Sequence, residues 1–277
     1  MTQSVLISAE QLYNLTQHND LILLDATIDK VNATLKNEPL EVIPGSFFFD
    51  IEQRLSDHHS DLPHTIIDAK TFQNYARALG LDYDKTIVVY DRWGVYSSPR
   101  AWWTLKLFGF DKVYVLNGGL MSWKNAHYKV DTKHQQPKNN SQIEIKFAKQ
   151  WLAKSKDVLE QIDNANSVTI DARSPGRFNG TSLEPRKGLR SGHIPNSYSL
   201  FFEDVLNQNQ YQTAAELIKT FERISSQENE LIFTCGSGVT ACILALAAYV
   251  VGYRNIRVYD GSWSEWGKDE SLPIAKS

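Results

Sequence analysis

Short, predominantly apolar runs alternate along the chain with longer stretches of mixed polarity. Apolar runs without polar alternation are typical of strands buried on both faces, as in parallel sheets. The clearest are residues 21–24, 86–90, 113–116, 168–170, 231–234 and 256–259. Helices are predicted at about residues 9–16, 71–79, 98–108 and 239–251. We therefore predict an α/β fold with mainly parallel sheets flanked by helices.

Local signals set the ends of the predicted helices. Ser8 followed by Gln11 forms a capping-box pattern before the first helix. Pro99 lies where the first turn of a helix tolerates proline, and Gly80 and Gly109 are typical C-terminal stops.

The order of these segments repeats once along the chain, at an offset of 143 to 151 residues. Four matches in the same order argue against a coincidence between common strand motifs and for one fold used twice. The matched segments are 23–27 with 169–173, 43–46 with 194–197, 88–91 with 232–235, and 115–118 with 258–261.

Residues 131–142 lie between the two halves and contain no large apolar side chain. A segment of this composition cannot bury itself and reads as a surface linker. We predict two domains, residues 1–130 and 143–277, joined by this linker, which fits the usual domain size for 277 residues.

Composition places the chain among ordinary globular proteins, with 42% hydrophobic and 22% charged residues. The formal charge of −3 provides no general attraction for nucleic acid or an anionic membrane. The longest apolar run, residues 241–252, is too short to span a bilayer. Residues 1–5 show no export signal, so we expect a cytoplasmic protein.

Two cysteines, Cys235 and Cys242, are too few for a disulfide framework, and seven scattered histidines show no metal-ligand spacing. On one helix their Cα atoms would lie about 10 Å apart, beyond the reach of a disulfide. We expect two free thiols in a reducing compartment and no metal site.

Cys235 opens a glycine-rich turn between a predicted strand and a predicted helix. Gly236 and Gly238 allow backbone N–H groups to converge, and together with the helix N-terminus they would form an anion cradle. Such a cradle favours the reactive thiolate. Taken alone, Cys235 could equally be an inert core residue, but its place in this turn favours a nucleophile. Cys242 lies among Ala, Ile and Leu and is expected in the core.

The residues 235–241, CGSGVTA, and the later segment 259–267, YDGSWSEWG, resemble those of two-domain rhodanese-type sulfurtransferases, most closely the 3-mercaptopyruvate sulfurtransferases. The resemblance covers both halves and the linker. It implies two tandem rhodanese-like domains and transfer of sulfur from 3-mercaptopyruvate through a Cys235 persulfide, with release of pyruvate. Asp91 stands at the matching place in the first half, which implies that this half is chemically silent, since a carboxylate cannot carry sulfane sulfur.

The resemblance also implies the partners: a small sulfur donor, and an acceptor such as cyanide, thioredoxin or a low-molecular-weight thiol, with no metal or organic cofactor. Thiosulfate enzymes typically place Arg and Lys after the cysteine, where this chain has Gly236 and Ser237. A donor with one carboxylate needs less positive charge beside the sulfur. Gly236, Gly238, Val239 and Thr240 are the expected substrate cradle.

Two arginines, Arg177 and Arg186, match the family pair that grips the donor carboxylate and carbonyl. Guanidinium groups suit planar oxyanions through paired hydrogen bonds. Lys187, Arg190 and His193 follow closely and could add to a positive rim.

The family match further suggests a relay of Ser237, His64 and an acid at Glu52, which could polarise the donor carbonyl or protonate the departing enolate. The acid is Glu where animal enzymes tend to have Asp, and the spacing between Glu52 and His64 is one residue longer. Rival candidates lie nearby at Asp57, His58, His59 and Asp61.

Three other activities have to be weighed. A cysteine phosphatase uses a similar cradle, but its phosphate-binding Arg, six residues after the cysteine, is replaced here by Ala241. A thiosulfate sulfurtransferase would need a different charge pattern after Cys235. A non-enzymatic sulfur carrier is less consistent with the arginine pair and Ser237, because these would serve to select a small donor.

Overall fold

The computed structural model describes residues 4–137 and 141–277, so residues 1–3 of the expected N-terminus and 138–140 of the expected linker lie outside the described residues. The chain divides into two compact units. Unit 1 comprises Met1–Ser56, Ile67–Ala148 and Gln208–Gln210, and unit 2 comprises Asp57–Ile66, Lys149–Asn207 and Tyr211–Ser277.

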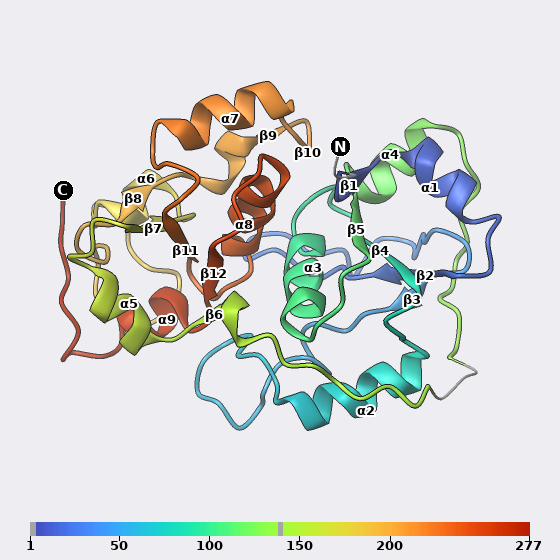
Figure 1. Cartoon of the computed structure of the whole chain (residues 1–277), viewed down its shortest axis with the longest axis horizontal. Helices are drawn as coiled ribbons and strands as arrows, with labels where there is room; N and C mark the ends of the chain where they lie inside the picture. The colour runs from blue at the N-terminus through green and yellow to red at the C-terminus, as the bar shows by residue number, and fades with distance from the viewer. Residues whose placement is uncertain (1–3, 138–140) are drawn as a thin grey trace. The chain divides into compact units, whose positions relative to one another are not determined.

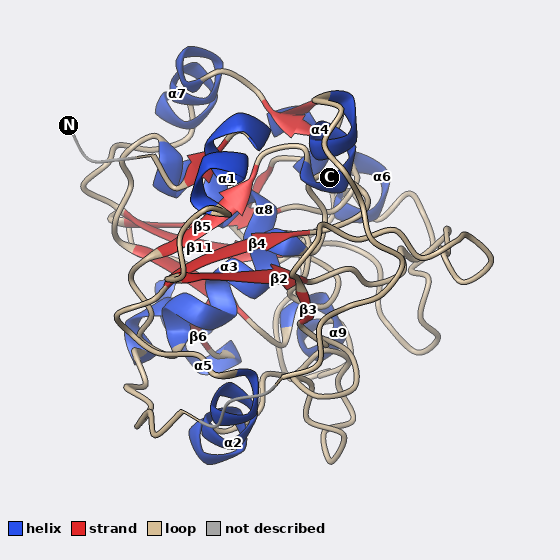
Figure 2. Cartoon of the chain, turned by 90° about the vertical axis from the view of Figure 1, so that its right-hand side faces the viewer, coloured by secondary structure: helices blue, strands red, loops and turns tan. Residues whose placement is uncertain are grey.

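Unit 1 is built on a five-stranded sheet with the order β1-β5-β4-β2-β3, and each strand pair in it is parallel. Helices α1 and α4 lie on one face of this sheet, and α2 and α3 on the other (Figure 2). The strands are β1 (Leu6–Ile7), β2 (Leu21–Asp25), β3 (Phe47–Phe48), β4 (Thr86–Tyr90) and β5 (Val113–Leu116). The helices are α1 (Ala9–Leu15), α2 (Ala69–Leu79), α3 (Ser98–Leu107) and α4 (Gly119–Asn125).

The predicted helix ends in unit 1 are confirmed to within two residues. Ser8 and Gln11 form a reciprocal capping box at the start of α1. Helix α2 begins two residues earlier than predicted, because the Asp68 side chain accepts the N–H groups of Lys70 and Thr71. Gly80 ends that helix with φ 73°, a conformation that glycine adopts without strain.

Unit 2 repeats the arrangement, with the sheet order β6-β12-β11-β7-β8 and parallel pairing (Figure 1). The strands of this sheet are β6 (Leu152–Ala153), β7 (Ser167–Asp171), β8 (Tyr198–Ser199), β11 (Glu230–Thr234) and β12 (Ile256–Tyr259). The strands β9 (Leu206–Asn207) and β10 (Gln210–Tyr211) form a separate two-stranded sheet. The helices are η1 (Lys149–Trp151), α5 (Ser155–Gln161), α6 (Pro175–Phe178), η2 (Phe202–Val205), α7 (Ala214–Glu222), α8 (Ala241–Val250) and α9 (Ser262–Trp266).

The two sheet orders correspond strand for strand, which confirms the repeat seen in the sequence. Trp123 and Trp266 each follow the end of β5 or β12 by seven residues. Both lie in the hydrophobic core of their unit. The central strands β4 and β11 also correspond, and they end directly before Asp91 and Cys235. In parallel sheets the loops at the carboxyl ends of strands carry the chemistry, so these two residues begin equivalent loops.

The described part of the expected linker packs on unit 1. Asp131 forms a bridge with Val42, and His134 Nε2 lies 2.9 Å from Asp25 Oδ2 at the end of β2. The segment is therefore tied down in spite of its polar composition, because backbone and side-chain hydrogen bonds replace apolar burial.

Candidate active site

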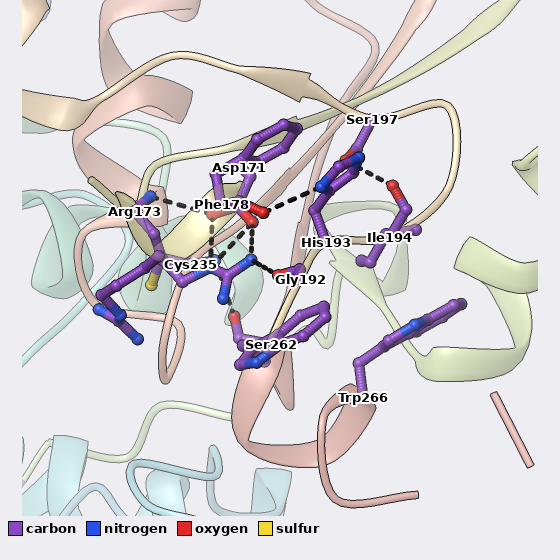
Figure 3. A network of polar contacts seen from close by, with 12 residues as sticks. Asp171, Arg173, Phe178, Gly192, His193, Ile194, Ser197, Cys235, Ser262 and Trp266 are labelled. Carbon is purple, nitrogen blue, oxygen red and sulfur yellow. Dashed lines mark hydrogen bonds and ion pairs between the residues drawn. The ribbon is translucent and has the colours of Figure 1, made fainter. Parts of the chain in front are cut away.

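The loop that begins with Cys235 is fastened to the start of helix α9. The Cys235 N–H donates to Ser262 Oγ at 3.2 Å (Figure 3). The Trp263 backbone N–H donates to the Cys235 carbonyl at 2.9 Å. Ser264 donates to the Gly236 carbonyl from both its N–H and its hydroxyl, at 3.0 and 2.6 Å. Cys235 itself is 2% exposed. These bonds fix the backbone that carries the thiol.

Ser262 was not singled out from the sequence, yet it supports the cysteine directly. It is fully buried and has φ 48°, a left-handed conformation that costs energy in any residue other than glycine. Its hydroxyl donates to the Tyr259 carbonyl at 2.8 Å while accepting the Cys235 N–H. The left-handed backbone at Ser262 therefore helps to fix the position of Cys235.

The two glycines of the loop have different structural roles. Gly238 has φ 79°, as the expected cradle requires. Gly236 is not among the glycines with positive φ; instead, a Cβ atom added there would lie 3.0 Å from Arg177 Nη2. The missing side chain at position 236 therefore provides the space in which the Arg177 guanidinium lies.

The corresponding loop of unit 1 holds a carboxylate of its own. Asp91 Oδ2 accepts the N–H groups of Tyr96, Ser97 and Ser98 at 2.8, 3.1 and 2.9 Å, and the Ser98 hydroxyl at 2.7 Å. Asp91 Oδ1 accepts the Trp93 N–H at 2.9 Å, and the residue is fully buried. Unit 1 thus retains an anion cradle, which its own side chain fills.

Arg177 belongs to α6 and is the last of four side chains of alternating charge. This row consists of Asp171, Arg173, Glu184 and Arg177. Arg177 Nη2 lies 2.6 Å from Glu184 Oε2, and Arg173 Nη1 lies 2.8 Å from Glu184 Oε1. Arg173 in turn is paired with Asp171 at 2.7 Å and donates to the Gly192 carbonyl at 2.8 Å (Figure 3). The row runs from the end of strand β7 to the Cys235 loop.

Burial decreases along this row toward the cysteine. The side chains of Asp171 and Arg173 are 0% exposed, that of Glu184 is 2% exposed, and that of Arg177 is 23% exposed. Arg173 also lies over the Trp263 ring, 4.1 Å from its centroid, which adds a cation–π contact. Only the last guanidinium of the row is placed to meet a ligand.

Two of the three residues of the expected relay are brought together. His64 Nδ1 lies 3.1 Å from Ser237 Oγ, although the two are 173 residues apart in the sequence. His64 belongs to the segment Asp57–Ile66 of unit 2 and has φ 59°, a left-handed conformation. The Ile66 N–H donates to Asp260 Oδ2 at 2.8 Å, which anchors this segment beside the end of β12.

The other candidates for the relay lie near His64 in the sequence, and the structure gives each of them its own surroundings. Glu52 lies in unit 1, in the turn that follows β3. Asp57 Oδ1 accepts the His59 N–H at 2.9 Å, and Asp61 pairs with Lys268 at 3.7 Å with a side chain that is 90% exposed. His58 and His59 are exposed. Asp57 therefore stabilises a turn, and Asp61 is a surface charge.

The basic residues from Arg186 to His193 differ in exposure and in their partners. Arg186 is half-buried and Lys187 is exposed. Arg190, however, donates to the carbonyls of Trp266 and Leu272 at 2.9 and 3.1 Å. His193 is 7% exposed, stacks on Phe178, and its Nδ1 lies 2.9 Å from the Phe178 carbonyl (Figure 3). Arg190 and His193 both support the fold through these contacts, and His193 is too buried to form part of an exposed rim.

The two cysteines have the states expected from the sequence. Both cysteines are free thiols, and Cys242 is fully buried with its Sγ 3.2 Å from the Gly238 carbonyl, which confirms it as a core residue. Within residues 4–137 and 141–277 no three His, Cys, Asp or Glu side chains gather as a metal site would need. No helix in the described part of the chain has the length and apolarity to cross a bilayer.

Known proteins share this architecture. The sequence model of the protein family with the rhodanese-like domain matches residues 8–126 and 154–269, one match in each half of the chain. The 3-mercaptopyruvate sulfurtransferase of Escherichia coli K12 is 39% identical over 233 residues, which cover 84% of this chain and 82% of that protein. The thiosulfate/3-mercaptopyruvate sulfurtransferase 1 of Arabidopsis thaliana is 34% identical, covering 99% and 78% of the two chains.

A solved structure agrees with these matches. The crystal structure of SseA from Escherichia coli, described as a 3-mercaptopyruvate sulfotransferase with the rhodanese fold, superposes with a TM-score of 0.83 at 33% identity. The superposition covers 94% of this chain and 99% of that one. With both halves matched by the domain model and whole-length relatives above 30% identity, the chain belongs to the rhodanese family.

Proposed function

We propose that this protein is a 3-mercaptopyruvate sulfurtransferase that moves sulfur to a thiol acceptor through a persulfide on Cys235. The observation that carries the proposal is the placement of the Arg177 guanidinium against Gly236, next to the cysteine. A carboxylate-bearing donor held by Arg177 would have its sulfur a few bonds away, at the Cys235 thiol. The relatives of this length that carry the mercaptopyruvate name support the same substrate.

The first half-reaction is a displacement at sulfur. The Cys235 thiolate attacks the sulfur of 3-mercaptopyruvate, an S–S bond forms, and the C–S bond breaks. The electron pair of that bond stays on carbon and gives the enolate of pyruvate, which takes up one proton. The sulfur's own proton leaves the new persulfide, so the net products are the Cys235 persulfide anion and pyruvate.

The second half-reaction returns the enzyme to its starting state. An acceptor thiolate, or cyanide, attacks the outer sulfur of the persulfide, and Cys235 departs as the thiolate. No electrons enter or leave the pair of reactions, so no redox cofactor takes part in this scheme. A small thiol or a dithiol protein such as thioredoxin is the acceptor that we propose, in the cytoplasm.

The proton for the enolate comes, in this proposal, from the pair Ser237 and His64. Their contact at 3.1 Å is short enough for a hydroxyl to pass a proton and be reprotonated by the imidazole. Because Nδ1 faces Ser237, an acidic partner of His64 would contact Nε2, and Glu52 is the acid that the family pattern favours.

Donor binding falls to the arginines and the loop backbone. Arg177 and Arg186 grip the carboxylate and the carbonyl, and the loop of Gly236, Gly238, Val239 and Thr240 surrounds the reacting sulfur. The corresponding loop of unit 1 shows that a backbone of this kind can bind an anion. Three of its N–H groups converge there on one oxygen of Asp91.

Initial rates with 3-mercaptopyruvate and with thiosulfate, each with cyanide and with a dithiol reductant, test the proposal. We expect mercaptopyruvate to be preferred with both acceptors. Incubation with the donor alone should add the mass of one sulfur, about 32 Da, to the peptide that contains Cys235. Added sulfur on Cys242, an active Cys235→Ser variant, or hydrolysis of an aryl phosphate in place of sulfur transfer would contradict it.

A further inference from the structure

Glu184 is a buried carboxylate shared by two arginines. Its Oε1 lies 2.8 Å from Arg173 Nη1, and its Oε2 lies 2.6 Å from Arg177 Nη2, while the side chain is only 2% exposed. Burial of a carboxylate is costly unless it is paired and hydrogen-bonded. Here both oxygens are satisfied by guanidinium groups, so Glu184 links Arg177 to Arg173.

We propose that Glu184 is a positioning residue, which holds Arg177 against the Cys235 loop in the orientation that receives a donor carboxylate. The proposal rests on the function proposed above and deepens it, because it names what makes the site selective for a planar monoanion. Glu184 does not touch the donor in this scheme and acts only through Arg177.

The first argument comes from how weakly Arg177 is held by anything else. It lies on the four-residue helix α6, and its side chain is 23% exposed. An arginine with this much freedom loses substantial side-chain entropy when it is fixed in one rotamer. Glu184 provides that fixation, because it accepts from both Nε and Nη2 of Arg177, at 3.2 and 2.6 Å for Oε2.

The second argument concerns which edge of the guanidinium is left for a ligand. With Nε and Nη2 bound to Glu184, Nη1 has no hydrogen-bond partner in the part of the chain that the structure describes. A Cβ atom added at Gly236 would lie 3.6 Å from Nη1 and 3.0 Å from Nη2, so this face of the group lies along the Cys235 loop. Glu184 therefore sets the direction in which Arg177 can donate.

The third argument is that Glu184 is itself held rigidly. Arg173 is fixed by Asp171 with three contacts of 2.7 to 3.1 Å, by the Gly192 carbonyl, and by the Trp263 ring. The backbone N–H of Trp263 also donates to the Cys235 carbonyl. Arg173 is thereby linked to the Cys235 loop through Trp263, and Arg177 lies against the same loop at Gly236. A shift of Glu184 would move the donor-binding arginine relative to the nucleophile.

The charges of the row also bear on the class of donor. Two carboxylates and two guanidiniums sum to zero, so the row attracts anions through the aimed N–H groups of Arg177 and not through net charge. Paired hydrogen bonds from one guanidinium suit a carboxylate. A compact dianion such as thiosulfate gains less from this arrangement, because it is best stabilised by uncompensated positive charge.

Steady-state kinetics of Glu184→Gln give the first test, since the amide is nearly isosteric but carries no charge. We expect KM for mercaptopyruvate to rise about tenfold or more, with kcat within about threefold of wild type, as for loss of a binding contact. Glu228→Gln, an exposed glutamate of the same unit, is the control for net charge. A fall in kcat with unchanged KM would overturn the proposal.

Alkylation of Cys235 gives a second test that needs no sulfurtransferase activity. In a Cys242→Ala background, the rate ratio of iodoacetate to iodoacetamide reports how strongly the site attracts a carboxylate beside the thiol. Glu184→Gln should lower this ratio about fivefold or more, because the aimed contact with Arg177 is charge-assisted. An unchanged or higher ratio would mean that Glu184 merely neutralises Arg177.

A double-mutant cycle separates positioning from a general effect on the fold. In an Arg177→Ala background, Glu184→Gln should change neither KM nor the alkylation ratio further, because the residue it acts through is gone. Additive effects would refute the proposal. If Glu184→Gln is unstable, Glu184→Asp keeps the charge that Arg173 needs but is too short to reach both arginines, and it should show the same loss.

The two tests also separate this inference from the proposed function. A lowered alkylation ratio in an enzyme that does not use mercaptopyruvate would leave the role of Glu184 standing for another carboxylate donor. Normal use of mercaptopyruvate by Glu184→Gln, with an unchanged ratio, would leave the function standing and remove the role of Glu184.

Discussion

Asp91 and Cys235 are the first residues after the corresponding central strands β4 and β11, and each opens the loop that leads to a helix at the carboxyl edge of its sheet. In unit 1 this place holds a carboxylate that accepts three backbone N–H groups and a hydroxyl on a single oxygen. In unit 2 it holds a thiol. The same loop has therefore become a structural anchor in one half and is the proposed nucleophile site in the other.

Removal of the Asp91 carboxylate should destabilise unit 1. Asp91→Ala would leave the buried N–H groups of residues 96–98 without their acceptor, so we expect the free energy of unfolding to fall by about 2–4 kcal/mol. Urea denaturation followed by tryptophan fluorescence measures the change. Asp84→Asn, an exposed residue of the same unit, should be neutral.

The effect of Asp91→Ala on the chemistry distinguishes the two roles. We expect a folded fraction of the variant to retain the persulfide-forming reaction at Cys235, since the carboxylate lies in the other unit. A variant of full stability that had lost donor turnover would mean that Asp91 takes part in the reaction and is not an anchor.

The contact between His64 and Ser237 predicts that the two side chains serve the same proton-transfer step. Ser237→Ala and His64→Asn should each lower kcat for mercaptopyruvate by about 10²-fold or more, the usual size of general acid–base assistance. The double variant should be no worse than either single one, because both changes break the same proton path. Alkylation of Cys235 by iodoacetamide should continue in all three variants.

A different pattern would change the assignment. If the losses from Ser237→Ala and His64→Asn multiplied, the two side chains would act in separate steps. The variant Glu52→Gln tests the third residue of the proposed relay. We expect the pH profile of kcat to shift in this variant only if Glu52 is the acid that orients His64.

Tyr75 predicts a loss of stability at high pH. Burial raises the pKa of this phenol to about 12, while the unfolded chain has the ordinary value near 10. Its folded pKa is raised, so the stabilising contribution is complete below about pH 10 and is lost as the pH rises through about 12. The phenol accepts the Asp50 N–H at 2.9 Å and donates to the Phe48 carbonyl at 3.2 Å, which requires the protonated form.

Comparison of wild type with Tyr75→Phe isolates this group from the other buried tyrosines. The wild-type advantage in the free energy of unfolding should shrink by roughly 2–3 kcal/mol between about pH 9 and pH 12. Urea unfolding at a series of pH values measures it. A difference between the two proteins that stayed constant with pH would show that the Tyr75 phenol titrates normally.

Much of the architecture could be predicted because it depends on local pattern. The apolar runs that became β2, β4, β5, β7, β11 and β12 are central in their sheets and read as strands without knowledge of the fold. The two-residue edge strands, such as β1 and β6, have too few residues to leave a pattern. They are defined only by pairing with a neighbour that is distant in sequence.

The site was predicted less completely, and the missing parts share one cause. Cys235, Ser237 and Arg177 lie in recognisable motifs, whereas Glu184, Asp260 and Ser262 act through contacts that only the folded chain makes. Glu184 was given no role from the sequence, because its burial between two arginines follows from the course of an irregular loop. Ser262 has a left-handed backbone where glycine is the usual choice, which no local propensity predicts.

The loop after Cys235 should determine the choice of donor. The double change Gly236→Arg and Ser237→Lys places two cations within about 6 Å of the thiolate, worth on the order of 2–3 kcal/mol each before screening at an effective dielectric near 20. After screening by water and salt we expect a gain of roughly tenfold or more in kcat/KM for thiosulfate. Turnover of mercaptopyruvate should fall in parallel, because the Ser237 hydroxyl is lost.

The structure identifies a second reason for that fall. Gly236 does not have positive φ, so arginine there is free of backbone strain, but even a Cβ atom would lie 3.0 Å from Arg177 Nη2. The new side chain therefore displaces Arg177 and repels it. Gly236→Ala is the matched control: it should raise KM for mercaptopyruvate by moving Arg177, without improving thiosulfate. A folded double variant whose ratio of thiosulfate to mercaptopyruvate activity did not rise would show that the donor is selected outside this loop.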